Sequence, residues 1–440
     1  MSRTPSGGYP PLLFVVLAAG AFSASCRQGI VPANAIMHPT EENLPAPGGP
    51  LIGADTVLSS ASDPGRAANW AAARRAILDA EIVTRIGAAT GDGPDVLGIV
   101  GDAAIDEDGN VYIQENTTDE LLVFSPSGDL LHRTGGTGDG PEEFRGIRRF
   151  VRLPDGRLVV AHDGGAAKVL ELRDQGYRYA GLLLEDQTSE IPAIIDMCAV
   201  GKRIFLHATN LGSADPDPHR IIREVSTDEA RVTASLADGY LSEFEEDRQR
   251  RSYGTIACGD GPPALVWSLY YFPVVKAYRP DNTLLWTALI EDFEQGLIYQ
   301  NNARSSSVHP IGSSQEYLIG THALRPGFVV VQAVQLGRPV PNEGLGSMPV
   351  LRMRTYLLDQ ETGNGGVVSD DLPWIAWIGE SSFITVPSDP YPKVEVRGLS
   401  PELRRVAEER WPVQNFSRRQ CVGQRMTRDL TRTTGERDTR

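Results

Sequence analysis

Positive charge is scarce in this chain of 440 residues, which has 42 Lys and Arg against 57 Asp and Glu and a formal net charge of −15 at pH 7. Proteins that hold nucleic acid through its phosphates need clustered positive charge, so no nucleic-acid partner is expected. The sequence also lacks a Gly-x-Ser-x-Gly elbow, a His-Glu-x-x-His pair and a phosphate-binding loop ending in Gly-Lys-Ser/Thr. These absences favour a non-catalytic protein with no bound cofactor and no metal.

Long amphipathic helical patterns are missing too, whereas 45 Gly, 31 Pro and 41% hydrophobic residues indicate a turn-rich, all-β domain. The long apolar run Pro11–Phe22 has the length of a signal peptide and is short for a membrane span. Residues 1–25 are therefore expected to direct export, to the periplasm, the cell surface or the medium. Cys26 follows directly, where a bacterial lipoprotein would be acylated; a lipid anchor there is an open alternative and the only membrane contact expected.

The strongest positive signal is an internal repeat. The tetrapeptide Gly-Asp-Gly-Pro occurs at 91–94 and again at 138–141, 47 residues later, and the turn dipeptide Asp-Gly recurs with the same spacing at 108–109 and 155–156. Between the two tetrapeptides, short β-branched and aromatic runs alternate with tight turns, which predicts four strands. A four-stranded antiparallel unit repeated at this spacing is typical of a propeller blade.

Six hydrophobic anchors, each just before a turn, mark the third strand of successive blades. They are Phe124, Leu172, Val225, Tyr278, Leu357 and Val396. The fourth interval is the longest, and an insertion is expected there over Gln332–Val350. The run Glu81–Gly87 precedes the first complete blade and is expected to close the last one. The prediction is an all-β, six-bladed β-propeller of four-stranded antiparallel blades over residues 80–400, acting as a monomer.

Two segments of the repeat resemble a known family. The segment Val111–Phe124 resembles the core of an NHL-type repeat, and Gly138–Phe144 resembles the link between such repeats in exported bacterial six-bladed propellers. The likeness is specific over about residues 80 to 180, and it implies a fold and an exported location but no single activity. The sequence departs from the NHL pattern at Glu115, where Asp is usual, and at Thr118, where Asn is usual.

The flanks of the propeller have a different composition. Residues 26–79 are rich in Pro and are expected to form a flexible tether. Residues 401–440 are expected to form a short helix followed by a disordered, Arg-rich tail, because that tail has too few apolar residues to fold alone.

Two cysteines occupy equivalent places in adjacent blades. Cys198 and Cys258 each lie three residues before a turn glycine, Gly201 and Gly261. A disulfide between the third and fourth blades suits an exported protein. Two buried free thiols are the alternative, since a disulfide needs Cα atoms closer than about 7 Å.

Candidate ligand-binding residues come from the same register. The sixth residue after each turn glycine is Glu115, His162, His207 or Trp267, and Asn116 and Asp163 come next to the first two. All are predicted on one face, near the mouth of the central channel, where they would bind a protein, a peptide or a glycan. The alternative function is a metal-dependent lyase or lactonase at that mouth, although residues of neighbouring blades are poorly placed to share one metal ion.

Overall fold

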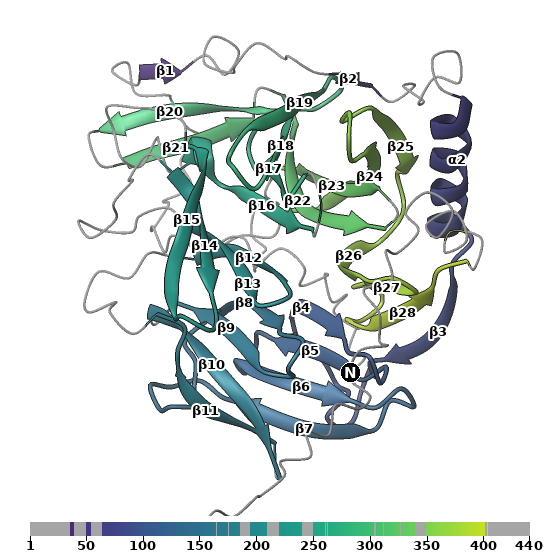
Figure 1. The fold of residues 1–440 in the computed structure, drawn as a ribbon. Helices are drawn as coiled ribbons and strands as arrows, with labels where there is room; N and C mark the ends of the chain where they lie inside the picture. Colours follow the sequence, from purple (N-terminus) through teal and green to yellow (C-terminus); the bar gives the residue numbers. More distant parts are fainter. Residues whose placement is uncertain are drawn as a thin grey trace, which may run out of the picture.

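The computed structural model describes residues 36–38, 50–53, 64–163, 165–174, 176–184, 194–208, 220–239, 250–259, 261, 263–302, 305–310, 312–325, 327–338, 348–400 and 403. Six four-stranded antiparallel units stand in a ring around a central axis (Figure 1). The predicted six-bladed β-propeller is confirmed.

The blades follow one another along the chain, and in each the first strand lies innermost. The first blade contains β4 (Val100–Ile105), β5 (Val111–Glu115), β6 (Glu120–Phe124) and β7 (Leu130–Gly135). The second contains β8 (Ile147–Arg152), β9 (Leu158–His162), β10 (Gly165–Arg173) and β11 (Gly176–Leu182). The third contains β12 (Ile194–Val200), β13 (Arg203–Ala208), β14 (Arg220–Ser226) and β15 (Arg231–Asp238).

The remaining blades have additions. The fourth contains β16 (Gly254–Cys258), β17 (Leu265–Leu269), β18 (Val274–Tyr278) and β19 (Leu284–Ile290), with β2 (Leu51–Ile52) parallel to β19 at its edge. The fifth contains β22 (Ser314–Leu324), β23 (Phe328–Gly337), β24 (Val350–Asp359) and β25 (Gly365–Ser369). The sixth contains β26 (Trp374–Ile378), β27 (Ser382–Val386), β28 (Val394–Gly398) and β3 (Glu81–Ile86).

The apolar core lies between the blades. Six clusters of buried side chains each join two neighbouring blades around the ring, from the first and second to the sixth and first. A blade therefore buries both faces of its sheet, so its middle strands are apolar almost throughout; all five residues of β5 and of β17 are buried. This double burial explains why strict polar and apolar alternation is weak in the sequence.

The repeated Gly-Asp-Gly-Pro segment is a structural link between blades. Its second copy joins the outer strand β7 to the inner strand β8, and it folds back on Phe144, whose carbonyl accepts a hydrogen bond from the Gly138 amide at 2.9 Å. The Phe144 ring is fully buried between the first two blades. The tetrapeptide thus sets the path of the chain from one blade to the next.

The N-terminal strand closes the ring, as predicted. Strand β3 pairs antiparallel with β28 from Glu81 opposite Gly398 to Ile86 opposite Val394. An ion pair between Arg85 and Glu395, at 3.0 Å, lies on the same ladder. The last blade is thus made from the two ends of the propeller sequence.

All six predicted anchors lie in third strands, but the insertion was placed wrongly. The extra residues form a separate hairpin, β20 (Gly296–Asn302) and β21 (Ser305–Pro310), to which β1 (Ile36–His38) adds a third strand. The range Gln332–Val350 begins instead within β23, which pairs along its length with β22 and β24. Residues 339–347 of that range lie outside the described residues.

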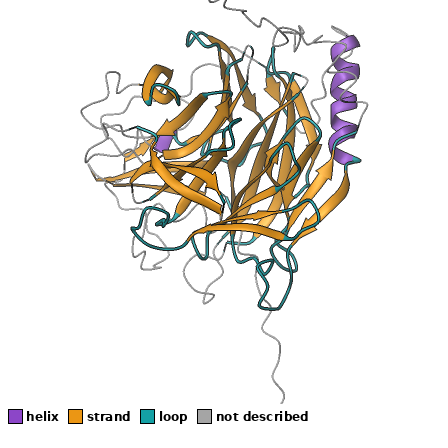
Figure 2. Cartoon of the chain, turned by 60° about the horizontal axis from the view of Figure 1, so that its bottom comes forward, coloured by secondary structure: helices purple, strands orange, loops and turns teal. Residues whose placement is uncertain are grey.

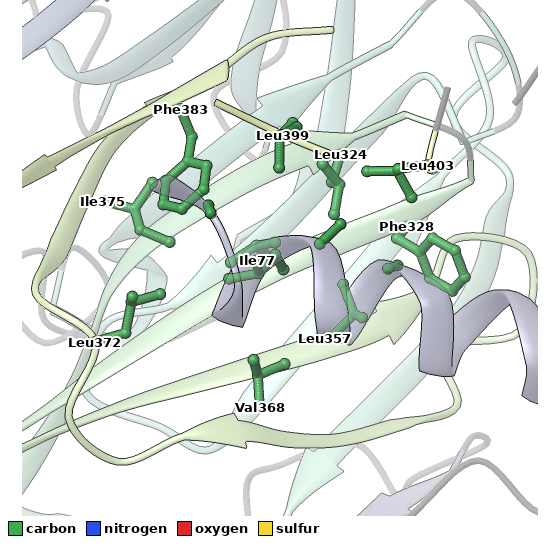
Figure 3. Close-up of a cluster of buried hydrophobic side chains, with 14 of the residues drawn as sticks. Ile77, Leu324, Phe328, Leu357, Val368, Leu372, Ile375, Phe383, Leu399 and Leu403 are labelled. Carbon is green, nitrogen blue, oxygen red and sulfur yellow. The ribbon is translucent and has the colours of Figure 1, made fainter. Parts of the chain in front are cut away.

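The segment expected as a tether, 26–79, contains a helix. Helix α2 (Pro64–Leu78) lies against the outside of the fifth and sixth blades (Figures 1 and 2). Trp70, Ala73 and Ile77 are buried at the spacing of one helix face and belong to one apolar cluster with Phe328 and Leu357. Figure 3 shows Ile77 of the helix facing this cluster. Residues 64–79 therefore belong to the folded unit, as do the short strands β1 and β2 earlier in the same range.

Other predictions about the termini lie outside the described residues. These are the signal segment 1–25, the acylated Cys26 and nearly all of the tail 401–440, of which only Leu403 is described. No helix within the described ranges is long and apolar enough to cross a membrane.

Candidate functional site

A cavity of about 350 Å³ lies on the propeller axis, and the innermost strands of all six blades line it. Strands β4, β8, β12, β16, β22 and β26 contribute to its wall. Its volume is within the range of small-molecule sites, about 300–1,000 Å³.

Three charged residues, Asp102, Arg149 and Asp196, face this cavity from the first three blades. The Arg149 Nε lies 2.9 Å from Asp196 Oδ1, and its Nη1 lies 3.6 Å from Asp102 Oδ1. Each of the three follows a shift of register in its inner strand, after Val100, Ile147 or Ile194. Because a bulge re-aims the next side chain, the repeated irregularity places all three at the axis.

Burial dominates the electrostatics of this triad. It raises the pKa of Asp102 to about 7, with Arg149 opposing the shift and Asp196 adding to it. Burial also raises the pKa of Asp196, although Arg149 and the amides of Ile256 and Met197 favour its ionised form. For Arg149, burial lowers the pKa but the two carboxylates outweigh it, so the guanidinium stays charged.

The opposite wall is polar but uncharged. Thr255 and Thr321 hydroxyls are 2.6 Å apart, which links the fourth and fifth blades. The Nε2 atom of His322 lies 2.9 Å from the carbonyl of Ile375, to which the neutral ring donates. Burial, with a contribution from Arg149, lowers the pKa of His322 to about 4, so this ring is neutral near pH 7.

Aromatic and covalent features complete the wall. Trp374 and Trp377 are among the residues that line the cavity from the sixth blade. Cys198 in β12 and Cys258 in β16 form a disulfide that also lines it, with their Cα atoms 5.9 Å apart. This bond crosses between the third and fourth blades.

Glu115, one of the predicted ligand-binding residues, is engaged in local hydrogen bonds. Its carboxylate accepts from the Ile99 amide at 2.8 Å, the Thr118 amide at 2.9 Å and the Thr118 hydroxyl at 2.7 Å. The neighbouring Asn116 accepts a hydrogen bond from Gln114 at 2.7 Å. These contacts fix the loop between β5 and β6 and the entry to β4.

His207 and Trp267 are both fully buried behind the inner strands. The His207 Nδ1 atom lies 2.9 Å from the carbonyl of Gly254 in the next blade, and burial lowers its pKa to about 4. The two rings meet edge to face at 6.0 Å, and Lys276 lies over the Trp267 ring at 5.5 Å. These contacts pack the third blade against the fourth.

Asp163 is exposed and His162 is half-buried. The His162 ring packs edge to face on Phe144 at 5.7 Å, and burial, followed by the charge of Lys168, lowers its pKa. Asp163 forms an ion pair with Arg148. The structure does not gather the six predicted residues into one pocket, and none of them lines the axial cavity; their ligand-binding role stays a prediction.

Sequence reasoning missed the residues of the cavity, although a signal for the triad was present. Asp102, Arg149 and Asp196 follow one another at intervals of 47 residues, the same spacing that revealed the repeat. The predicted ligand-binding residues were taken from the second strand of each blade, whereas the residues at the axis belong to the first strands. Thr255 and His322 break the spacing because longer connections precede them.

A metal site is not supported by the donor groups. Within the described ranges, no group of three or more His, Cys, Asp or Glu side chains is arranged to hold a metal ion. The residues predicted for a metal-dependent enzyme do not fit that role, so no step is assigned to a metal.

Comparisons with known proteins concern the fold alone. No family model matches the chain, and no curated protein matches it. It is similar in structure to a Bacteroides fragilis protein to which export is ascribed, with 9% identity over 80% of this chain and 99% of that chain and a TM-score of 0.46. It is also similar to virginiamycin B lyase from Staphylococcus aureus, with 10% identity over 72% and 99% of the two chains and a TM-score of 0.38. The assignment as a propeller rests on the chain's own strand pairing.

Proposed function

We propose that this protein is an exported, non-catalytic β-propeller that binds its ligand in the central channel. The observation that carries the proposal is the axial cavity, in which a charged triad is held by three consecutive inner strands. The ligand would be a small molecule, or the end of a peptide or glycan that reaches into the channel. Export is supported by the N-terminal apolar segment and by the disulfide, which suits an oxidising compartment.

We also propose that the likeness to NHL-type repeats reflects common ancestry. It implies no particular activity. The lyase or lactonase alternative lacks a metal donor set in the described ranges, so the binding function is preferred. Cys26 as an acylation site, with a membrane-bound propeller, is the corresponding proposal for location.

A screen with small probes tests the proposal. The probes are amines, amino-acid amides, dipeptides, monosaccharides and carboxylates, each added to the wild-type protein while its melting temperature is recorded. The same screen uses Ala323→Phe, which adds a ring at a residue that lines the cavity, and Ala180→Phe, an exposed position on β11, as the matched control. Mass spectrometry of the recovered probe detects turnover.

The proposal predicts that one probe class raises the melting temperature of the wild type and of Ala180→Phe but not of Ala323→Phe, and is recovered unchanged. Stabilisation that persists in Ala323→Phe places binding elsewhere. Conversion of the bound probe to a product contradicts the non-catalytic role.

A further inference from the structure

The charged groups that face the channel cavity do not balance. Three carboxylates, Asp102, Glu107 and Asp196, share the lining with two guanidinium groups, Arg149 and Arg152. Glu107 and Arg152 pair with each other at 2.7 Å, and the Glu107 side chain is 73% exposed, so this pair is at the rim. The excess negative charge therefore lies deeper, in the triad.

Within the triad, Arg149 is committed to Asp196. Its Nε donates to Asp196 at 2.9 Å, whereas the 3.6 Å to Asp102 exceeds the length of a normal hydrogen bond. Asp196 also accepts from the Ile256 amide at 2.8 Å and the Met197 amide at 2.9 Å. One carboxylate thus offsets the guanidinium charge and is well supplied with donors.

Asp102 is the carboxylate of the triad that has fewer hydrogen-bond donors. It is 8% exposed, accepts a hydrogen bond from the Ala103 amide at 2.9 Å and has the Phe150 amide as a second donor. An ionised carboxylate offers about four acceptor positions. The ionised form of a carboxylate this deeply buried is costly unless a partner enters, and the raised pKa of Asp102 reflects that cost.

Among the described residues that line the cavity, only Arg149 and Arg152 are cations, and they pair with Asp196 and Glu107. His322 is neutral near pH 7, and Tyr253, which faces Arg149 and Asp196, has its pKa raised to about 12 by burial and stays uncharged. Besides the polar Thr255, Thr321 and His322, the lining of the cavity includes the aromatic residues Trp374 and Trp377. Aromatic side chains pack well against apolar groups and attract cations.

We infer that the channel ligand is a small organic cation, a protonated amine on an apolar or aromatic body, whose ammonium group pairs with the Asp102 carboxylate. The inference rests on the proposed function, in that the channel must be the binding site. The net charge of −15 would favour the approach of a cation over that of an anion.

A pH profile follows from the burial of Asp102. Burial raises its pKa to about 7, and an ammonium group binds the ionised form, so affinity increases as pH rises through that value. Between pH 6 and pH 8 the ionised fraction increases about ten-fold, and the association constant increases by the same factor. An Asp102→Asn variant, which has no such titration, should show a flat profile.

Calorimetric titration tests the inference with three probes of one shape, 2-phenylethylammonium, neutral 2-phenylethanol and anionic 3-phenylpropionate. Each is titrated at pH 8 into the wild type, Asp102→Asn, Ala323→Phe and Glu229→Gln. Glu229 is an exposed carboxylate beside Arg231 on the outer edge of the third blade and serves as the matched control. Unfolding midpoints of all variants are recorded first.

We expect the ammonium probe to bind the wild type and Glu229→Gln at least ten-fold more tightly than the other probes, with that preference lost in Asp102→Asn and binding lost in Ala323→Phe. Equal or tighter binding of the alcohol or the carboxylate, lost in Ala323→Phe, overturns the ligand class while the channel site stands. If no probe of any class loses binding in Ala323→Phe, the proposed function itself fails. Should Asp102→Asn not fold, the wild-type pH profile decides, and a flat profile contradicts the inference.

Discussion

At the scale of single residues, the axis of this propeller is defined by polar side chains placed after irregularities in inner strands. Asp102, Arg149 and Asp196 each follow such an irregularity and meet around the cavity. One blade later the equivalent wall is formed by Thr255, which carries no charge. The charge is therefore confined to one side of the channel, and this asymmetry gives the site an orientation.

Glu115 illustrates how a single buried carboxylate stabilises the loops between strands. Glu115 accepts hydrogen bonds from four backbone amides, of Gly98, Ile99, Thr117 and Thr118, and from the Thr118 hydroxyl. Removal of its charge leaves these donors poorly satisfied. We expect Glu115→Gln to lower the free energy of unfolding by about 1–3 kcal/mol at pH 7, measured by urea denaturation, with Glu107→Gln at the exposed rim as control.

The effect of Glu115 should depend on pH. Burial alone would raise its pKa, but hydrogen bonds from Thr118, Ile99 and Thr117 outweigh burial and hold the pKa below the ordinary value of 4.5. The stabilisation is therefore present above that value and is lost as the pH falls below it. An equal difference between wild type and Glu115→Gln at pH 7 and at pH 3 would contradict this explanation.

At the scale of elements, the ring is held by contacts between blades rather than within them. The disulfide joins β12 to β16 across a sequence separation of 60 residues. Strand β3 completes the sixth blade from the far end of the chain, and α2 covers the fifth and sixth blades. Each of these elements ties together parts of the chain that are distant in sequence.

Loss of the disulfide should weaken the ring measurably. Closing a loop of this length stabilises a fold by about 2–4 kcal/mol, because the bond restricts the unfolded chain. We expect a Cys198→Ser, Cys258→Ser double variant to melt at a lower temperature than the wild type and to lose about 2–4 kcal/mol of its free energy of unfolding. Intact-mass measurement with and without reductant should show a loss of two hydrogens in the untreated protein; an unchanged mass would show free thiols.

Helix α2 should contribute through one face only. Trp70 is 3% exposed and its Nε1 donates to the carbonyl of Leu357 at 2.8 Å, whereas Leu78 on the same helix is 38% exposed. We expect Trp70→Ala to cost about 3–5 kcal/mol and Leu78→Ala to cost much less. Urea denaturation of both variants measures this, and equal small losses would mean that the helix does not dock in solution.

At the scale of the whole molecule, six blades close into a ring whose inner strands surround an axial cavity. The blade repeat and ring closure could be predicted because turns and strand lengths recur locally in the sequence. Helix α2 could not be predicted, because the proline-rich sequence before it suggested a tether. Only the packing of the helix on the fifth and sixth blades shows which of its faces is buried. The triad was missed because the repeat was followed along second strands, although Asp102, Arg149 and Asp196 recur every 47 residues in first strands.

The cellular location of the whole protein can also be tested. The N-terminal apolar run predicts that the full chain, made in a bacterial host, is recovered outside the cytoplasm. If Cys26 is acylated, the wild type partitions into membranes and Cys26→Ser is released in soluble form. Recovery of the wild type in the cytoplasmic fraction would contradict export, and equal partitioning of both forms would contradict the lipid anchor.

The most direct test of the central claim is the calorimetric titration of 2-phenylethylammonium at pH 8 into the wild type and into Ala323→Phe. The channel site predicts a saturable isotherm with one probe per chain for the wild type and no detectable heat of binding for the filled channel. The same isotherm in both proteins would contradict the account, because the ligand would then be bound outside the propeller axis.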